Sequence, residues 1–242
     1  MWAICKKEWA HYFGSLSGYL IISFYLLVNG LLLFVLPNFN VLDFGYTSLQ
    51  VYFDFAPWIL ILLIPAITMR SIAEERRTGT IELLFTRPIS DLGILLAKYF
   101  AGVTLLIIAI IPTIFYYFTM YYLGNPVGII DLGATITSYI GLVLLGSVFV
   151  AIGIFASSLT SSQIVSFILA MFMCWFIYDG LGLLGSFAQI GDLDTIVRYL
   201  GIAFHYESIK KGVIDTSDII YFISVIFLFL YGALTVIKTL KR

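Results

Sequence analysis

The sequence predicts an all-α membrane protein with six transmembrane helices. Of its 242 residues, 61% are hydrophobic and only 11% are charged, and its mean hydropathy is +1.05. A soluble domain usually carries about 25% charged residues, so a chain this apolar requires lipid around much of its surface. Apolar blocks long enough to cross a membrane recur along the chain, and we interpret residues 1–242 as a single transmembrane domain.

The apolar blocks define the predicted spans. A helix rises about 1.5 Å per residue, and the hydrocarbon core is about 30 Å thick. The block 132–178 has no charged residue and would be about 70 Å long as one helix, so it must contain two, with a break at the polar cluster 157–163. Pro112 predicts a kink within the third span. The six spans are 18–36, 56–72, 95–123, the two halves of 132–178, and 219–237.

The distribution of Lys and Arg predicts the orientation. Six spans put both termini on one side of the membrane, and ten of the 13 cations fall on that side. Because Lys and Arg are enriched in cytoplasmic loops, both termini and the segment 73–90 are expected in the cytoplasm. The ten are Lys6, Lys7, Arg70, Arg76, Arg77, Arg87, Lys98, Lys238, Lys241 and Arg242, and the three opposite are Arg198, Lys210 and Lys211.

Two segments outside the spans have their own patterns. Residues 1–13 predict an interfacial helix, because apolar and polar side chains separate onto two faces. Residues 180–218 form an external segment, with an apolar piece, 181–187, too short to cross, and an exposed stretch, 191–218. On the first helix, Trp2, Cys5, Trp9, Tyr12 and Phe13 share one face, and Lys7, Glu8 and His11 share the other.

The segment 73–90, AEERRTGTIELLFTRPIS, concentrates charge between two apolar blocks. Gly79 can break a helix, Thr80 can cap a new one, and Glu82 then lies in its first turn, where the helix dipole favours an acid. Pro88 ends this short amphipathic helix. A loop that only orients the chain needs no such order, so we expect a docking surface for a cytoplasmic partner. The expected docking residues are Glu74, Glu75, Gly79, Thr80, Glu82, Leu83, Leu84 and Pro88.

Several other functions are disfavoured by the sequence. His11 and His205 are predicted on opposite sides of the membrane, and no Cys, His or acidic spacing matches a metal site. No G-x-x-x-x-G-K-[ST] loop occurs, so the chain is not expected to bind ATP or to be an enzyme. No basic groove suggests nucleic acid. Almost no charged residue lies within the predicted spans, which disfavours coupling to an ion gradient.

Small residues in the fourth span, at Gly141, Gly146, Gly153, Ala156 and Ser157, favour close contact between helices. Ordinary packing within the chain explains such a pattern as well as contact with another subunit does.

The run EERRTGTIELL followed by TRPIS resembles the coupling-helix region of ABC-2 type transporter permeases. Three further stretches, YYLGNPVG, VAIGIFASSLTSSQIVSFILA and FHYESIKKGVIDTSDIIYF, make the chain most similar to the permease subunit of the gliding-motility-associated ABC transporter. The resemblance implies an ABC-2 permease fold with a cytoplasmic coupling helix, in a multi-pass protein of the bacterial inner membrane.

The resemblance also implies partners. A cytoplasmic ABC ATPase, which holds ATP and Mg²⁺, would bind the segment 73–90, and a second permease subunit, identical or different, would complete the transport path. The chain itself would bind no cofactor. An alternative is a scaffold subunit that transmits ATPase motion to a surface machine without moving cargo.

Overall fold

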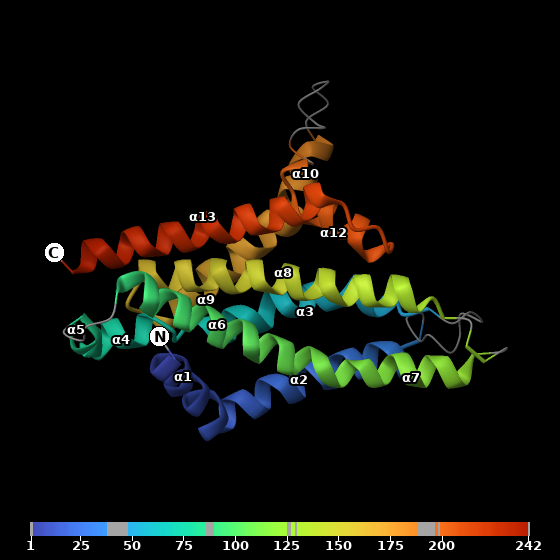
Figure 1. Ribbon diagram of the computed structural model, residues 1–242, viewed down its shortest axis with the longest axis horizontal. Helices are drawn as coiled ribbons and strands as arrows, with labels where there is room; N and C mark the ends of the chain where they lie inside the picture. The colour runs from blue at the N-terminus through green and yellow to red at the C-terminus, as the bar shows by residue number, and fades with distance from the viewer. Residues whose placement is uncertain are drawn as a thin grey trace.

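The computed structural model describes residues 2–37, 48–85, 90–124, 127–128, 130–187, 197 and 199–241, without the side chains of residues 17, 83–85, 186 and 187. The chain is an all-α membrane protein (Figure 1). The helices in these ranges are α1 (Trp2–Gly14), α2 (Leu16–Phe34), α3 (Gln50–Thr68), α4 (Ala73–Arg77), α5 (Thr80–Phe85), α6 (Asp91–Ile110), α7 (Ile114–Leu123), α8 (Leu132–Leu159), α9 (Gln163–Trp175), α10 (Leu181–Phe187), α12 (Ile202–Lys210) and α13 (Thr216–Leu240).

Five helical runs in the described residues are long and apolar enough to span a membrane, and a sixth is added if α1 and α2 count as one bent span. The five begin at α3, α6, α8, α9 and α13. The predicted first span corresponds to α2, which meets α1 at an angle of 66°. The predicted second span, 56–72, lies within the helical run Gln50–Arg77, in which α3 covers Gln50–Thr68 and therefore begins earlier than predicted.

Helix α8 lies at the centre of the bundle and packs against α3, α6, α9, α12 and α13 (Figure 1). Its small residues permit this contact. A Cβ atom on Gly153 would overlap the Thr68 hydroxyl of α3, and one on Gly141 would lie 2.6 Å from Ile209 Cγ2 of α12. The small residues of the fourth span therefore serve packing within the chain.

The predicted breaks occur where Pro112 and the polar cluster 157–163 indicated. Pro112 lies in a 3₁₀ turn, Ile111–Thr113, that separates α6 from α7. Helix α8 ends at Leu159 and α9 begins at Gln163. Proline removes a backbone donor, and the polar cluster offers the chain hydrogen bonds that compete with the helix.

Both chain termini and the short helices α4 and α5 lie at the same end of the bundle (Figure 1). Helix α1 turns sharply into α2 at this end. The close approach depends on Gly18, because a Cβ atom there would overlap the Tyr12 carbonyl oxygen. We call this junction the α1–α2 elbow.

The predicted exposed stretch 191–218 is wrong for the inner face of α12 and for Asp218 of α13, whereas Thr216 and Ser217 are exposed. Ile202 and Ile209 are buried, and His205 is only 2% exposed. His205 Nδ1 lies 2.7 Å from the buried Asp218 Oδ1 of α13. Helix α12 is amphipathic, and it packs its apolar face on α8 instead of facing water. Residues 191–196 and 198 lie outside the described residues.

The predicted faces of the first helix also need correction. α1 forms as expected, but its buried residues are Ile4, Cys5, Glu8 and Tyr12, whereas Trp2 is exposed. Glu8 was assigned to the polar outer face. It turns inward because a buried cation of α6 lies opposite it.

Candidate functional site

The described residues of the charged segment 73–90 form two short helices joined at a glycine. Helix α4 ends at Arg77, Gly79 has a φ of 72°, and α5 begins at Thr80. A positive φ is tolerated best by glycine, so the predicted break at Gly79 is confirmed. Thr80 is the first residue of α5, and its hydroxyl lies 2.9 Å from the Thr78 hydroxyl.

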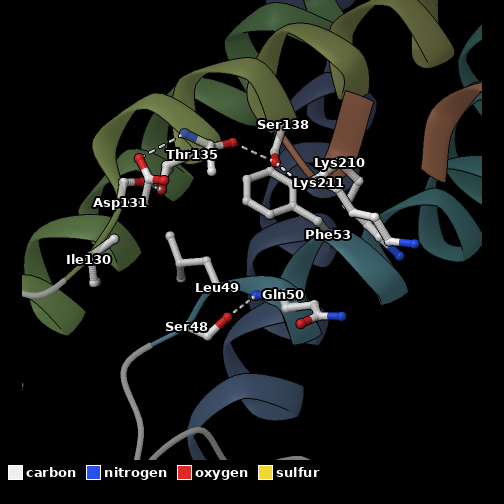
Figure 2. Close-up of a pocket in the computed structure, with 11 residues that line it drawn as sticks. Ser48, Leu49, Gln50, Phe53, Ile130, Asp131, Thr135, Ser138, Lys210 and Lys211 are labelled. Carbon is white, nitrogen blue, oxygen red and sulfur yellow. Dashed lines mark hydrogen bonds between the residues drawn. The ribbon is translucent and has the colours of Figure 1, made fainter. Parts of the chain in front are cut away.

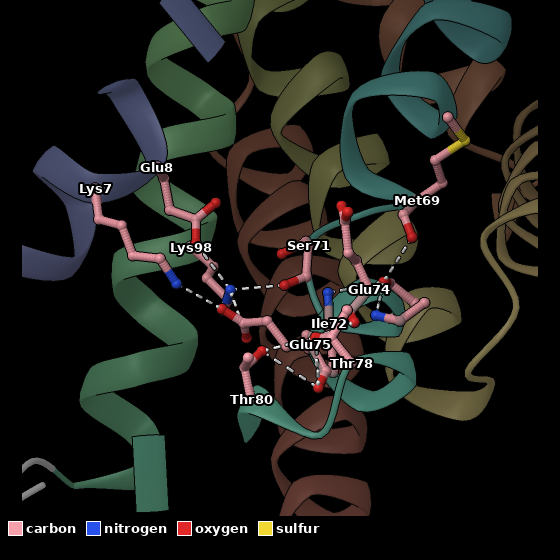
Figure 3. A network of polar contacts seen from close by, with 12 residues as sticks. Lys7, Glu8, Met69, Ser71, Ile72, Glu74, Glu75, Thr78, Thr80 and Lys98 are labelled. Atoms are coloured by element: carbon pink, nitrogen blue, oxygen red, sulfur yellow. Dashed lines mark hydrogen bonds and ion pairs between the residues drawn. The ribbon is translucent and has the colours of Figure 1, made fainter. Parts of the chain in front are cut away.

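Lys98 of α6 is the centre of a buried ion network behind α4 (Figure 3). Its Nζ atom lies 2.8 Å from Glu8 Oε1 of α1 and 3.0 Å from Glu75 Oε2 of α4. It also donates a 2.6 Å hydrogen bond to the Ser71 carbonyl. One buried ammonium thus connects three helices and the chain between α3 and α4.

A second cation reaches the same network from its outer side. Lys7 Nζ lies 3.0 Å from Glu75 Oε1, and its side chain is 61% exposed, against 2% for Lys98. The two bridges share one carboxylate but differ in solvation. An exposed pair is worth about 0–1 kcal/mol, whereas breaking a buried pair is far more destabilising. Lys98 therefore dominates the attachment of α4.

The other face of α4 is fastened to the end of α8. The Ser157 hydroxyl accepts hydrogen bonds of 3.0 Å from the backbone nitrogens of Ile72 and Ala73, and donates one of 3.2 Å to the Met69 carbonyl. Arg76 Nη1 donates a 2.6 Å hydrogen bond to the Ser158 carbonyl, near the last turn of α8. A cation at this helix end is favoured by the dipole and caps an otherwise free carbonyl.

We call this assembly the polar junction, defined by Glu8, Ser71, Glu75, Arg76, Lys98 and Ser157. It ties α4 to α1, α6 and α8. A displacement of α4 must therefore move three helices of the bundle or break buried polar contacts, which makes the junction suited to transmit motion.

The predicted docking residues separate into distinct environments. Glu75 is buried in the polar junction and faces Lys98, so it is not available at the surface. Glu82 is exposed in the first turn of α5, Glu74 is partly exposed, and Gly79 and Thr80 are exposed beside them. The side chains of Leu83 and Leu84, and all of Pro88, lie outside the described residues.

Five of the six residues of the polar junction were missed as site residues from sequence, namely Glu8, Ser71, Arg76, Lys98 and Ser157. Lys98 was counted only among the cytoplasmic cations, Glu8 was placed on an outer face, and Ser157 was read as a small packing residue. A lone lysine near the start of the predicted apolar span 95–123 is the signal that could have identified Lys98, because such a cation needs a buried partner.

The opposite end of the bundle contains a cavity of about 450 Å³ (Figure 2). Its polar groups are largely occupied by local contacts. Asp131 accepts the Ala134 N–H as the N-cap of α8, and Ser138 donates to the Lys210 carbonyl. Lys210 pairs with Asp54 and Glu207. The hydrogen bond from Lys210 lowers the pKa of Glu207 from its ordinary value. The cavity walls are thus fixed by structural pairs.

The fold and the polar junction define a multi-pass integral membrane protein with a charged two-helix unit fixed to one end of its bundle. The family model described as "ABC-2 family transporter protein" matches residues 40–239, so the chain belongs to that family. This makes it a membrane component of an ABC transporter, a class that works with a separate cytoplasmic ABC ATPase. A comparison with curated proteins finds no match.

Proposed function

We propose that this chain is the permease subunit of an ABC transporter of the gliding-motility type, in the bacterial inner membrane with both termini in the cytoplasm. It would pair with a second permease subunit, identical or different, and export an unidentified substrate. The observation that carries the proposal is the position of α4 and α5, which lie at the bundle end shared by both termini (Figure 1).

In this proposal the ATPase docks on α5 and the exposed edge of α4. Glu82 supplies a carboxylate at the start of α5, and Glu74 supplies a second one nearby. ATP-driven closure of the ATPase moves this unit. The polar junction then passes the movement to α1, α6 and α8 as rigid bodies, in the manner of other packed-helix transitions.

The test has two steps. The ATPase that co-purifies with the unaltered chain is first identified, and its recovery with variants of the chain is then measured. Glu82→Arg reverses an exposed charge at the start of α5. Ser217→Arg is the matched control, because it also places a cation in the first turn of an exposed helix end, but at the other end of the bundle. Both changes place a cation at a helix N-terminus, which the dipole disfavours by about 0.3–1 kcal/mol, and Glu82→Arg also removes a favourable acid there. Close charge pairs at interfaces are worth about 1.5–7 kcal/mol.

We expect Glu82→Arg to lower ATPase recovery about tenfold or more at normal expression, whereas Ser217→Arg leaves recovery unchanged. Equal recovery with both variants would mean that α5 is not the docking element. Vesicles containing the full complex separate the two functional alternatives. ATP-dependent substrate movement supports a transporter, and ATPase activity coupled to no substrate supports the scaffold subunit.

A further inference from the structure

Two adjoining hollows lie at the α1–α2 elbow, one apolar and one polar, each of about 240 Å³. The apolar hollow lies between α2 and α3, and Leu20, Ile21, Ala66 and Ile67 contribute to its walls. The polar hollow lies between α1 and the chain entering α4. The two hollows share a wall, because His11, Tyr12 and Arg70 line both of them.

The shared wall carries a cation, Arg70, and a ring N–H donor, His11, whose ring contacts that of Tyr12. Arg70 is exposed, and neither it nor His11 makes an ion pair or a hydrogen bond within the described residues. The Tyr12 hydroxyl already donates to the Ile67 carbonyl at 3.2 Å. Arg70 therefore contributes a permanent positive charge, and His11 a ring N–H, at the mouth of an apolar groove.

The acidic residues of the polar hollow do not cancel this charge at the shared wall. Glu8 and Glu75 are held by Lys98 and Lys7. Glu74 lines only the polar hollow and is absent from the apolar one. On the side of the apolar hollow, an anion placed between Arg70 and His11 meets no acidic residue among those that line it.

We propose that the elbow binds one anionic phospholipid. Its phosphate lies against Arg70 and His11, and one acyl chain occupies the groove between α2 and α3. Guanidinium groups match phosphate geometry, and an apolar groove that adjoins an unpaired cation is the chemical pattern of a headgroup joined to a chain. The charge also favours anionic over zwitterionic lipid.

The bound lipid would connect the elbow to the chain that leads from α3 into the polar junction. Arg70 directly precedes Ser71, whose carbonyl accepts the hydrogen bond from Lys98. The lipid would thereby stabilise the angle between α1 and α2 that Gly18 permits. This inference does not depend on ATPase docking at α5.

The test is native mass spectrometry of the full chain after exchange into palmitoyl-oleoyl phosphatidylglycerol or the matching phosphatidylcholine. Arg70→Gln removes the proposed phosphate contact, and Ala66→Trp fills the groove. Arg77→Gln is the matched control, because Arg77 is an exposed cation of α4 that lines neither hollow. We expect one retained phosphatidylglycerol for the unaltered chain and for Arg77→Gln.

Retention should fall about fivefold in Arg70→Gln, the ratio that corresponds to about 1 kcal/mol for one basic residue near an anionic headgroup. Ala66→Trp should lower retention as well, with the charge unchanged. Equal retention by Arg70→Gln and Arg77→Gln, or equal retention of phosphatidylcholine, would overturn the proposal. Displacement of the lipid by glycerol phosphate would also overturn it, because the site would then bind the anion alone.

Discussion

Replacing Lys98 with methionine should detach α1 and α4 from α6. The side chain of Lys98 is 2% exposed, and those of its partners Glu8 and Glu75 are only 10% and 12% exposed. Methionine keeps most of the volume and removes the charge, which leaves two carboxylates close together in a poorly solvated space. Removing one partner of a buried pair costs about 3–5 kcal/mol.

The same change at Lys7 provides the comparison. Lys7 bridges Glu75 at the same 3.0 Å distance, but its side chain is 61% exposed. An exposed pair contributes about 0–1 kcal/mol, so Lys7→Met should be nearly neutral. The predicted difference of about 2–5 kcal/mol corresponds to roughly one to four orders of magnitude in the opening equilibrium.

The two native cysteines can report whether α1 detaches from α6. Cys5 and Cys174 are both buried and free, and Cys5 packs with Ile94 and Ala97 of α6, whereas Cys174 lies in the main core. Reaction of a thiol-specific fluorophore with single-cysteine versions therefore separates local detachment of α1 from global unfolding. In Lys98→Met, Cys5 should react much faster, and Cys174 should change less.

Glu8→Gln should partly rescue this variant, because it removes the carboxylate that has lost Lys98, whereas Glu75 keeps its bridge to Lys7. The free-energy effects of Lys98→Met and Glu8→Gln should then be less than additive. If the fluorophore reacts with Cys5 at the same rate in the Lys98→Met and Lys7→Met variants, the buried network does not hold α1, and the reasoning fails.

Two further predictions address packing and orientation. Gly153→Leu should destabilise the detergent-solubilised chain by about 1–3 kcal/mol, because its side chain would overlap Thr68. Gly182→Leu, with open space around its Cβ position, should leave the melting temperature unchanged, and equal melting of both variants would refute the packing argument. In a background without native cysteines, cysteines at Ser90 and Ser217 should label from opposite sides of the membrane. Labelling of both from one side would contradict the six-span topology.

Local patterns predicted much of the fold. The breaks at Pro112, at Gly79 and in the cluster 157–163 each arise from the backbone chemistry of a few consecutive residues. Such features can be read without knowing which helices are neighbours. For the same reason, the short helix after Gly79 was expected close to its observed start at Thr80, although α4 was not predicted as a separate helix.

Contacts between distant residues could not be predicted in this way. Lys98 and Glu8 are 90 residues apart, and helical periodicity does not show that α1 and α6 meet. Glu75 looked like a surface acid because its sequence neighbours are charged, but α4 turns it toward Lys98. Helix α12 looked exposed because apolar and polar residues alternate within a short segment, although its apolar face meets the small residues of α8.

The most direct test of the central claim is site-specific crosslinking in membranes that contain the ATPase. A photoreactive amino acid at position 77 lies on the exposed edge of α4, beside the proposed docking residues without being one of them. The same group at position 217 is the control at the other end of the bundle. The account predicts an ATPase adduct from position 77 and none from position 217. An adduct from position 217, or none from position 77 while the complex is intact, would contradict it.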